Sequence, residues 1–190
     1  MQAEMAVTSD PDARVHPIEV EVLFRAHAPF VASFLRHMGT RECDLDDLVQ
    51  DVFVLAHRKG GYQPGPAAPR TWLASLAFRV VLARRRSRAR RPESTAELER
   101  LPDDARDPAE VLETQRSLER VKAALEHLSL EHRAAFILHE IEEESCESIA
   151  ATWGVPIGTI HSRLHHARKR FLEVYERSTA RGLPSRRGER

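Results

Sequence analysis

The sequence predicts an all-α protein of two small helical domains, an N-terminal helical bundle and a C-terminal helix-turn-helix, joined by a flexible acidic linker. Nearly every apolar repeat in the chain has helical spacing, and no run alternates polar and apolar residues as a strand would. An acidic segment with two prolines interrupts the helical pattern near the middle of the 190 residues. Apolar residues make up 42% of the chain but aromatic residues only 6%, which favours small aliphatic cores.

Seven segments have helical periodicity, and residues that stop helices separate them. They are, in order, 18–37, 44–57, 70–88, 111–127, 130–142, 146–153 and 157–177. Glycines and prolines at 60–66 end the second helix, and Gly154 with Pro156 ends the sixth. We therefore predict an N-terminal domain over 18–91, a linker over 92–110, a C-terminal domain over 111–178 and flexible termini at 1–17 and 179–190, with one core in each domain.

The charges are segregated, although the 29 basic and 29 acidic residues give a formal net charge of zero. Six arginines occupy the eight positions 84–91, acidic residues dominate 93–113, and the chain turns basic again from His161. Such blocks indicate local partners of opposite charge.

Several classes of protein are excluded. Cys43 and Cys146 stand far apart, which argues against a disulfide framework or a zinc knuckle and favours a reducing cytosol. The N-terminus has no apolar signal region, and the longest apolar stretch, 72–83, is too short to span a bilayer, so we expect a cytoplasmic protein without membrane insertion. No glycine-rich phosphate loop, nucleophile elbow or metal-ligand cluster occurs, so we expect no enzyme, no cofactor and no metal site.

The C-terminal segment predicts a helix-turn-helix. Small Ala150 suits the crossing of two helices, Gly154 permits a left-handed turn, and a basic helix follows Pro156. The outward face of that second helix carries cations and short polar groups that suit phosphates and base edges. These residues are Thr159, His161, Ser162, Arg163, His165, His166, Arg168 and Lys169. A helical hairpin with a solvated charged face is the alternative interpretation, and a metal at His161 and His165 lacks an evident third ligand.

Segment 44–57 is amphipathic, with Leu45, Leu48 and Val52 on one face and an acidic stripe of Asp44, Asp47 and Asp51 on another. Asp44 can also cap the helix, and on this helix alone a solvated acidic face explains the stripe equally well. The next helix joins aromatic residues to the arginine run, a combination that suits single-stranded nucleic acid, although most of its aromatic and aliphatic residues also suit a core.

Four segments together resemble a bacterial extracytoplasmic-function (ECF) sigma factor of the sigma-70 family, from about residue 20 to 175. They are DLDDLVQDVFVLAHR, RTWLASLAFRVV with the arginine run, the acidic linker and SIAATWGVPIGTIHSRLHHARKR. The resemblance implies a surface that docks on the clamp helices of the RNA polymerase β′ subunit, formed by Asp44, Asp47, Gln50, Asp51 and Phe53. It also implies a surface for the minus-ten promoter element, formed by Arg70, Trp72, Phe78, Arg79, Arg84, Arg85 and Arg86. The helix-turn-helix would bind the minus-thirty-five element and touch the β flap.

The implied function is that of an alternative sigma factor, which binds core polymerase, recognises and melts promoter DNA and starts transcription without covalent chemistry. A further partner that the same resemblance implies is an anti-sigma factor. The predicted minus-ten helix departs from the residues that the family commonly shows at Ala74, Phe78-Arg79 and Ala83. The promoter sequences that relatives recognise are therefore not assigned to this chain. The alternative function is that of a free-standing helix-turn-helix regulator, which would bind a palindromic operator without polymerase.

Overall fold

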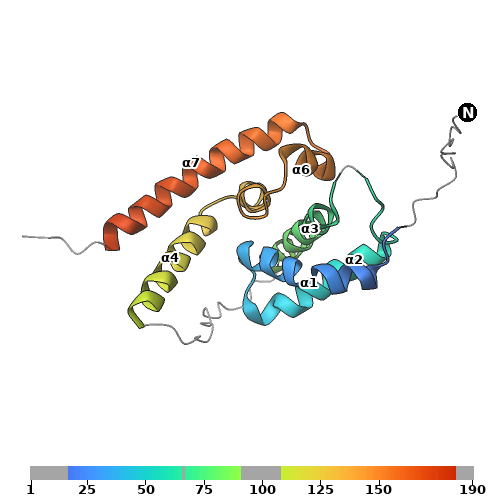
Figure 1. The fold of residues 1–190 in the computed structure, drawn as a ribbon, viewed down its shortest axis with the longest axis horizontal. Coiled ribbons are helices and arrows are strands. Elements are labelled where there is room, and N and C mark those ends of the chain that lie inside the picture. The colour runs from blue at the N-terminus through green and yellow to red at the C-terminus, as the bar shows by residue number, and fades with distance from the viewer. Residues whose placement is uncertain (1–16, 66, 91–107, 183–190) are drawn as a thin grey trace, which may run out of the picture.

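The computed structural model describes residues 17–65, 67–90 and 108–182. Within these ranges the chain is helical throughout, apart from turns and one isolated bridge between Ile18 and Tyr62 (Figure 1). The elements are α1 (Val20–His37), the 3₁₀ turn η1 (Glu42–Asp44), α2 (Leu45–Arg58), α3 (Pro69–Arg90), α4 (Pro108–Glu126), α5 (Leu130–Phe136), the π-helical turn η2 (Ile137–Ile141), α6 (Cys146–Trp153) and α7 (Ile157–Gly182). All seven predicted helices are confirmed, with small shifts at their ends.

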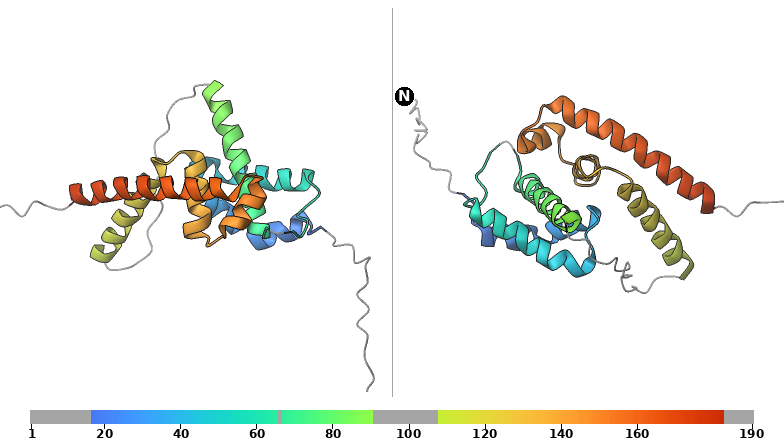
Figure 2. Two further views of the ribbon diagram at one scale, coloured as in Figure 1. Left: turned by 90° about the horizontal axis from the view of Figure 1, so that it is seen from above. Right: turned by 180° about the vertical axis from the view of Figure 1, so that it is seen from behind.

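The first three helices form a bundle around an aliphatic core. Leu48 and Val52 of α2 are buried, as the periodicity predicts, against Val31 and Leu35 of α1 and Leu73 of α3. The C-terminal end of α3, which carries the arginine run, extends away from the rest of the molecule (Figure 2). The run is therefore presented on a projecting helix.

The glycine turn after α2 fixes where α1 begins. Ile18 and Tyr62 exchange backbone hydrogen bonds of 2.8 and 3.2 Å across this turn. Gly61 has a φ of +82°, and a Cβ there would lie 2.5 Å from the carbonyl oxygen of Ile18. A side chain at this position would break the bridge, so glycine is required by both the backbone angle and the contact.

The C-terminal half packs α4 and α5 against the long helix α7. Gly154 adopts the predicted left-handed conformation, with a φ of +65°, and Ile149, Ile160 and Leu164 are buried around the turn between α6 and α7. Ser129 and Ser145 accept hydrogen bonds from the backbone N–H groups of His132 and Ser148, which caps α5 and α6. The predicted helix-turn-helix geometry is present.

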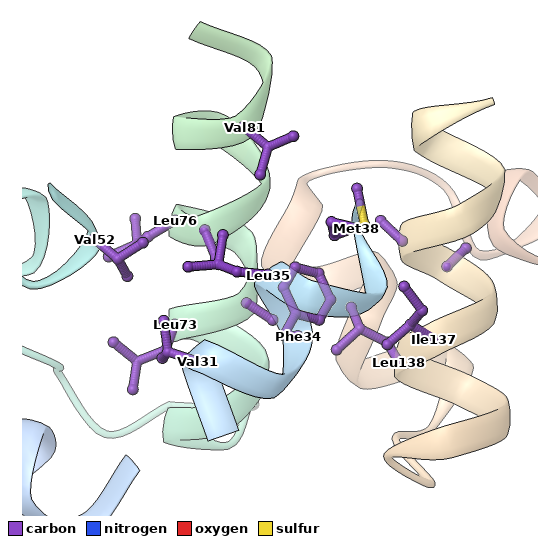
Figure 3. Packing of buried hydrophobic residues seen from close by; sticks show 14 of the residues in the cluster. Val31, Phe34, Leu35, Met38, Val52, Leu73, Leu76, Val81, Ile137 and Leu138 are labelled. Carbon is purple, nitrogen blue, oxygen red and sulfur yellow. The ribbon is translucent and has the colours of Figure 1, made fainter. Parts of the chain in front are cut away.

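The expectation of one separate core in each half is wrong. A single cluster of buried residues runs through both halves, and Phe34 of α1 and Met38, which directly follows α1, pack beside Ile137 and Leu138 of η2 (Figure 3). Hydrophobic periodicity marks which residues are buried but does not reveal which helix covers them, so it could not distinguish two cores from one.

Two boundaries also differ from the prediction. Helix α4 begins at Pro108 rather than at 111, because proline is favoured in the first turn of a helix, where its missing N–H costs nothing. Helix α7 continues to Gly182, and the hydroxyl groups of Ser178 and Thr179 both donate to the carbonyl oxygen of Tyr175 along its last turns. Residues 92–107 of the predicted linker, residue 91 of the predicted N-terminal domain and the outer parts of both predicted termini lie outside the described residues.

Candidate protein- and nucleic-acid-binding surfaces

An open apolar groove of about 640 Å³ lies between the N-terminal half of α1 and α2. Its lining residues are Val20, Phe24, Asp46, Val49, Gln50, Phe53, Val54, His57 and Arg58. Phe24 and Val54 are 48% and 41% exposed, although both are large and apolar. Such exposed apolar side chains in a groove indicate a binding surface for another protein.

The predicted docking residues divide into two groups around this groove. Gln50 and Phe53 line it, and the buried ring of Phe53 meets the ring of Phe24 edge to face, with a centroid distance of 4.9 Å. Asp47 and Asp51 are exposed on the same helix. An apolar groove beside free carboxylates is complementary to an amphipathic helix with basic residues along its edges.

Asp44 has a different environment from the other two acids of the stripe. It is only 7% exposed, and its carboxylate accepts hydrogen bonds from Arg41 at 2.7 Å, Arg88 at 2.5 Å and Arg84 at 3.2 Å. The bond from Arg41, followed by those from Arg88 and Arg84, holds the pKa of Asp44 far below its ordinary value. Asp44 makes no side-chain hydrogen bond to the start of α2, so the predicted capping role is wrong.

The arginine run is therefore partly occupied within the chain. Arg84 and Arg88 point from α3 toward Asp44 but keep nearly half of their side chains exposed. Arg79, Arg85 and Arg86 are exposed. Three guanidinium groups around one carboxylate still leave an excess of positive charge, so this end of α3 can attract phosphates.

Three predicted minus-ten residues in the first half of α3 make contacts within the chain, although Arg70 stays exposed. Trp72 is half-buried and meets the ring of Tyr62 edge to face at 5.7 Å. Phe78 stacks on Trp153 of α6, with ring centroids 5.4 Å apart and planes inclined by 14°. Arg70 pairs with Glu142, which follows η2, and its guanidinium lies 4.5 Å from the centre of the Phe30 ring.

The recognition face of α7 is largely open. His161, Ser162, His165, His166, Arg168 and Lys169 are exposed, whereas Thr159 and Arg163 are half-buried. Arg163 lies over the ring of Trp153 at 5.6 Å, and Arg168 pairs with Glu140 at 2.6 Å. Two of the cations on this face therefore have partners within the chain, while Lys169 remains exposed.

The histidines of α7 do not form a metal site with their neighbours. His161 and His165 line a pocket of about 350 Å³ with His139, Cys146 and Arg168, yet no group of three or more His, Cys, Asp or Glu among the described residues could hold a metal ion. His166 instead stacks on His132 of α5 at 5.9 Å. Burial, followed by the nearby His166, lowers the pKa of His132.

Three long-range contacts were not predicted: Trp153 with Phe78, Arg133 with Met38 and Glu142 with Arg70. Arg133 of α5 is 2% exposed and donates from Nη1 to the carbonyl oxygen of Met38 at 3.0 Å, at the C-terminal end of α1. The two residues of each pair lie more than 70 positions apart in the sequence, so no local pattern could have identified these contacts.

No helix among residues 17–65, 67–90 and 108–182 is both long enough and apolar enough to cross a membrane.

Two family models match the chain. Sigma-70 region 2 matches residues 23–91, and sigma-70 region 4 matches residues 118–171. The ECF RNA polymerase sigma factor SigE of Mycolicibacterium smegmatis is 33% identical over 80% of this chain, which corresponds to 59% of the length of SigE. The RNA polymerase sigma factor CarQ of Myxococcus xanthus is 32% identical over 81% of this chain and 87% of its own length.

Solved structures show the same arrangement of helices. The sigma factor RpoE from Bartonella quintana, in complex with the anti-sigma factor NepR, aligns with a TM-score of 0.65 and 25% identity over 82% of this chain and 96% of its own. CnrH, in complex with the cytosolic domain of CnrY, aligns with a TM-score of 0.54 and 26% identity over 83% of this chain and 88% of its own. The two family ranges follow one another along the chain, the first in the N-terminal half and the second in the C-terminal half.

Proposed function

Because the chain belongs to the ECF sigma factors of the sigma-70 family, we propose that it acts as an alternative sigma factor, which binds core RNA polymerase and directs promoter recognition, DNA melting and transcription initiation. Such a protein does no covalent chemistry. It supplies binding energy that positions polymerase and stabilises the opened duplex, in which each unstacked base costs a few kcal/mol.

The groove between α1 and α2 is the proposed docking surface for the clamp helices of the β′ subunit. The observation that carries this assignment is the exposed apolar groove with Asp47 and Asp51 on the same helix. Phe24, Phe53 and Val54 would contact the apolar face of a partner helix, and the two carboxylates would meet its basic residues. Asp44 is assigned a different role, since its carboxylate is held by three arginines of its own chain.

The DNA-binding surfaces lie on α3 and α7. We assign the minus-ten element to α3, where Arg79, Arg85 and Arg86 are exposed and the arginine run projects from the molecule (Figure 2). The minus-thirty-five element is assigned to the face of α7 that carries His161, Arg163 and Lys169, as in other helix-turn-helix proteins. An anti-sigma factor that masks these faces is the proposed regulator, and this is supported by the similar sigma factor RpoE, which was solved in complex with the anti-sigma factor NepR.

Replacing Asp47 and Asp51 with lysine tests the docking surface. Both side chains are exposed, so the double variant is expected to keep its helicity while its affinity for purified core polymerase falls by at least about tenfold, since two attractive contacts become repulsive. The matched control is Glu119→Lys with Glu176→Lys, which makes the same charge change on exposed positions of α4 and α7. Equal affinity of the two double variants would refute the docking role.

A further inference from the structure

Asp44 lies at the end of the turn η1, and contacts of this turn hold it in place. The neighbouring Glu42 accepts three hydrogen bonds from the guanidinium of Arg36 at the end of α1, at 2.7, 3.1 and 3.2 Å. The backbone N–H of Asp44 donates to the carbonyl oxygen of Arg41 at 3.0 Å, which closes the 3₁₀ turn. The carboxylate of Asp44 is therefore an anion at a fixed position beside the bundle.

Two arginines from the projecting end of α3 bind this carboxylate (Figure 2). Arg84 donates from Nη2 to Oδ1 at 3.2 Å, and Arg88 donates from Nη2 to Oδ2 at 2.5 Å. The two arginines are four positions apart and so lie on one face of α3. The helix residues from Ala83 to Arg88 are all exposed, so the bonds to Asp44 hold a part of α3 that lies outside the core.

The opposite face of α3 carries arginines that are open. Arg79 and Arg86 are seven positions apart, which is almost two full turns, and helical spacing puts both on the side away from Arg84 and Arg88. Both are exposed, and neither forms an ion pair or a hydrogen bond with another described residue. This end of α3 therefore presents two occupied guanidinium groups on one side and two open ones on the other.

A guanidinium that already binds a carboxylate is less available to a phosphate. The donor fork of arginine fits both anions, so a phosphate must compete with Asp44 for Arg84 and Arg88. The hydrogen bond from Arg41 holds the pKa of Asp44 far below its ordinary value, so the carboxylate stays ionised at neutral pH. Phosphate contacts carry no sequence information, and each arginine that Asp44 occupies removes one such contact.

We infer, on the basis of the proposed function, that Asp44 is a specificity-determining residue of the minus-ten surface. Its carboxylate takes the place of a phosphate on Arg84 and Arg88 and so restricts DNA binding to the open face of α3. In a complex with DNA of arbitrary sequence, any guanidinium that reaches a phosphate contributes to affinity. Polymerase, in contrast, presents promoter DNA to one face of α3. Occupying the other face therefore weakens random complexes more than the promoter complex.

A purely structural role for Asp44 predicts the opposite change in DNA binding. If Asp44 only kept the end of α3 in place, its loss would weaken every complex that this helix forms with DNA. If it acts as proposed, its loss releases Arg84 and Arg88 and strengthens the binding of random DNA. The direction of the change in affinity therefore distinguishes the two roles.

Asp44→Asn tests the role in the free full-length chain, with a DNA duplex of random sequence as the probe. The affinity of the variant for this duplex is expected to rise by at least about threefold at low salt. The slope of log K against log salt should become steeper by about 0.9 for each released arginine that reaches a phosphate, and so by up to about 1.8.

The matched control is Glu19→Gln, which removes the same charge from an exposed position whose side chain does not cap α1. It is expected to leave the salt slope unchanged. An unchanged or weaker affinity of Asp44→Asn for the random duplex, or an equal increase in both variants, would overturn the role of Asp44.

Two pairs of arginine variants test the same role without changing Asp44. Arg79→Gln with Arg86→Gln removes two open guanidinium groups, whereas Arg84→Gln with Arg88→Gln removes the two that Asp44 occupies. The first pair should lower the salt slope for the random duplex by about 1.8, and the second by less than half as much. Urea unfolding is measured for both. Equal decreases in the slope would overturn the role.

Transcription in the presence of competitor DNA measures the effect on specificity. With an excess of the random duplex, polymerase that carries Asp44→Asn is expected to lose at least about threefold more run-off transcript than polymerase with the wild-type chain. Equal losses would overturn the role of Asp44. A wild-type chain that neither binds core polymerase nor starts transcripts would instead contradict the proposed function, because the duplex titrations do not involve polymerase.

Discussion

At the scale of single residues, Asp44 and Asp47 lie three positions apart on one acidic stripe but have different surroundings. Asp47 is exposed, whereas Asp44 is enclosed by Arg41, Arg84 and Arg88. The stripe itself could be predicted from the spacing of the acids in the sequence. The different surroundings of Asp44 and Asp47 could not be predicted in this way. Arg84 and Arg88 are 40 and 44 positions away from Asp44 and reach it only after α3 folds back along α2.

Asp44→Asn is expected to lower the free energy of unfolding at pH 7 by about 1–3 kcal/mol, since it removes charge-assisted hydrogen bonds to a nearly buried carboxylate. Core polymerase affinity should change little. The pKa of Asp44 is lowered by folding, so its stabilising effect is present above the ordinary carboxyl pKa and is lost as pH falls through the lower folded value.

Urea unfolding of this variant and of Asp46→Asn, an exposed neighbour in the same turn, provides the measurement and its control. A decrease in polymerase affinity in Asp44→Asn as large as that in the Asp47 and Asp51 lysine variant would show that Asp44 is a docking residue after all.

At the scale of elements, the helices could be predicted because their causes are local. The apolar spacing in α2, the glycine and proline of the α6–α7 turn and the serines before α5 and α6 all act within a few residues. The π-helical turn η2 was not predicted, because its residues continue the apolar pattern of α5. Only the backbone hydrogen bonds differ, since a π-helix joins residues five positions apart and an α-helix joins residues four apart. Its residues Ile137 and Leu138 remain buried, so the pattern gave the correct core positions.

The face of α7 gives a prediction for DNA binding. Arg163→Ala with Arg168→Ala is expected to weaken binding to the minus-thirty-five element and to lower the slope of log K against log salt by about 0.9 for each phosphate that the variant no longer neutralises. Polymerase affinity should be unchanged. Because Arg168 also pairs with Glu140 and Arg163 with the Trp153 ring, the unfolding free energy is measured alongside.

The matched control for this variant is Arg170→Ala with Arg177→Ala, two exposed arginines further along α7 that pair with Glu173. If the affinity and the salt slope fell equally in both double variants, the effect would be one of total charge, and the assignment of the recognition face would be contradicted.

At the scale of the whole molecule, the order of the two halves was predictable from the sequence, but their contact was not. Each half has its own turn residues and apolar spacing, whereas the contact between the halves includes long-range pairs such as Phe78 with Trp153 and Arg133 with Met38. The same buried residues would satisfy two separate cores or one shared core, so only the structure could decide between them.

Two partly buried histidines, His37 at the end of α1 and His132 of α5, make stability depend on pH. Burial lowers the pKa of His37, whose neighbours include Arg36 and Glu142, and burial also lowers the pKa of His132 beside His166, Arg163 and Glu131. Because the folded pKa of each lies below the ordinary value of 6.5, the unfolded chain takes up protons first as pH falls. The free energy of unfolding should therefore be highest above about pH 6.5 and decrease toward pH 5.

Urea unfolding between pH 5 and 8 measures this dependence. His37→Gln should reduce the slope below pH 6.5, whereas His57→Gln, at an exposed position of α2, should not. An identical slope in the wild-type protein and in His37→Gln would show that the burial of His37 does not contribute to the pH dependence of the free energy of unfolding.

We propose that this sigma factor docks on polymerase through α1 and α2 and binds promoter DNA through α3 and α7. The most direct test is binding of the purified chain to bacterial core RNA polymerase, followed by run-off transcription across genomic fragments. A sigma factor is expected to form a stable complex with core polymerase and to give new transcripts whose start sites share two upstream elements. A chain that binds an operator tightly without polymerase, and that neither associates with core polymerase nor starts any transcript, would contradict this proposal and identify a free-standing regulator.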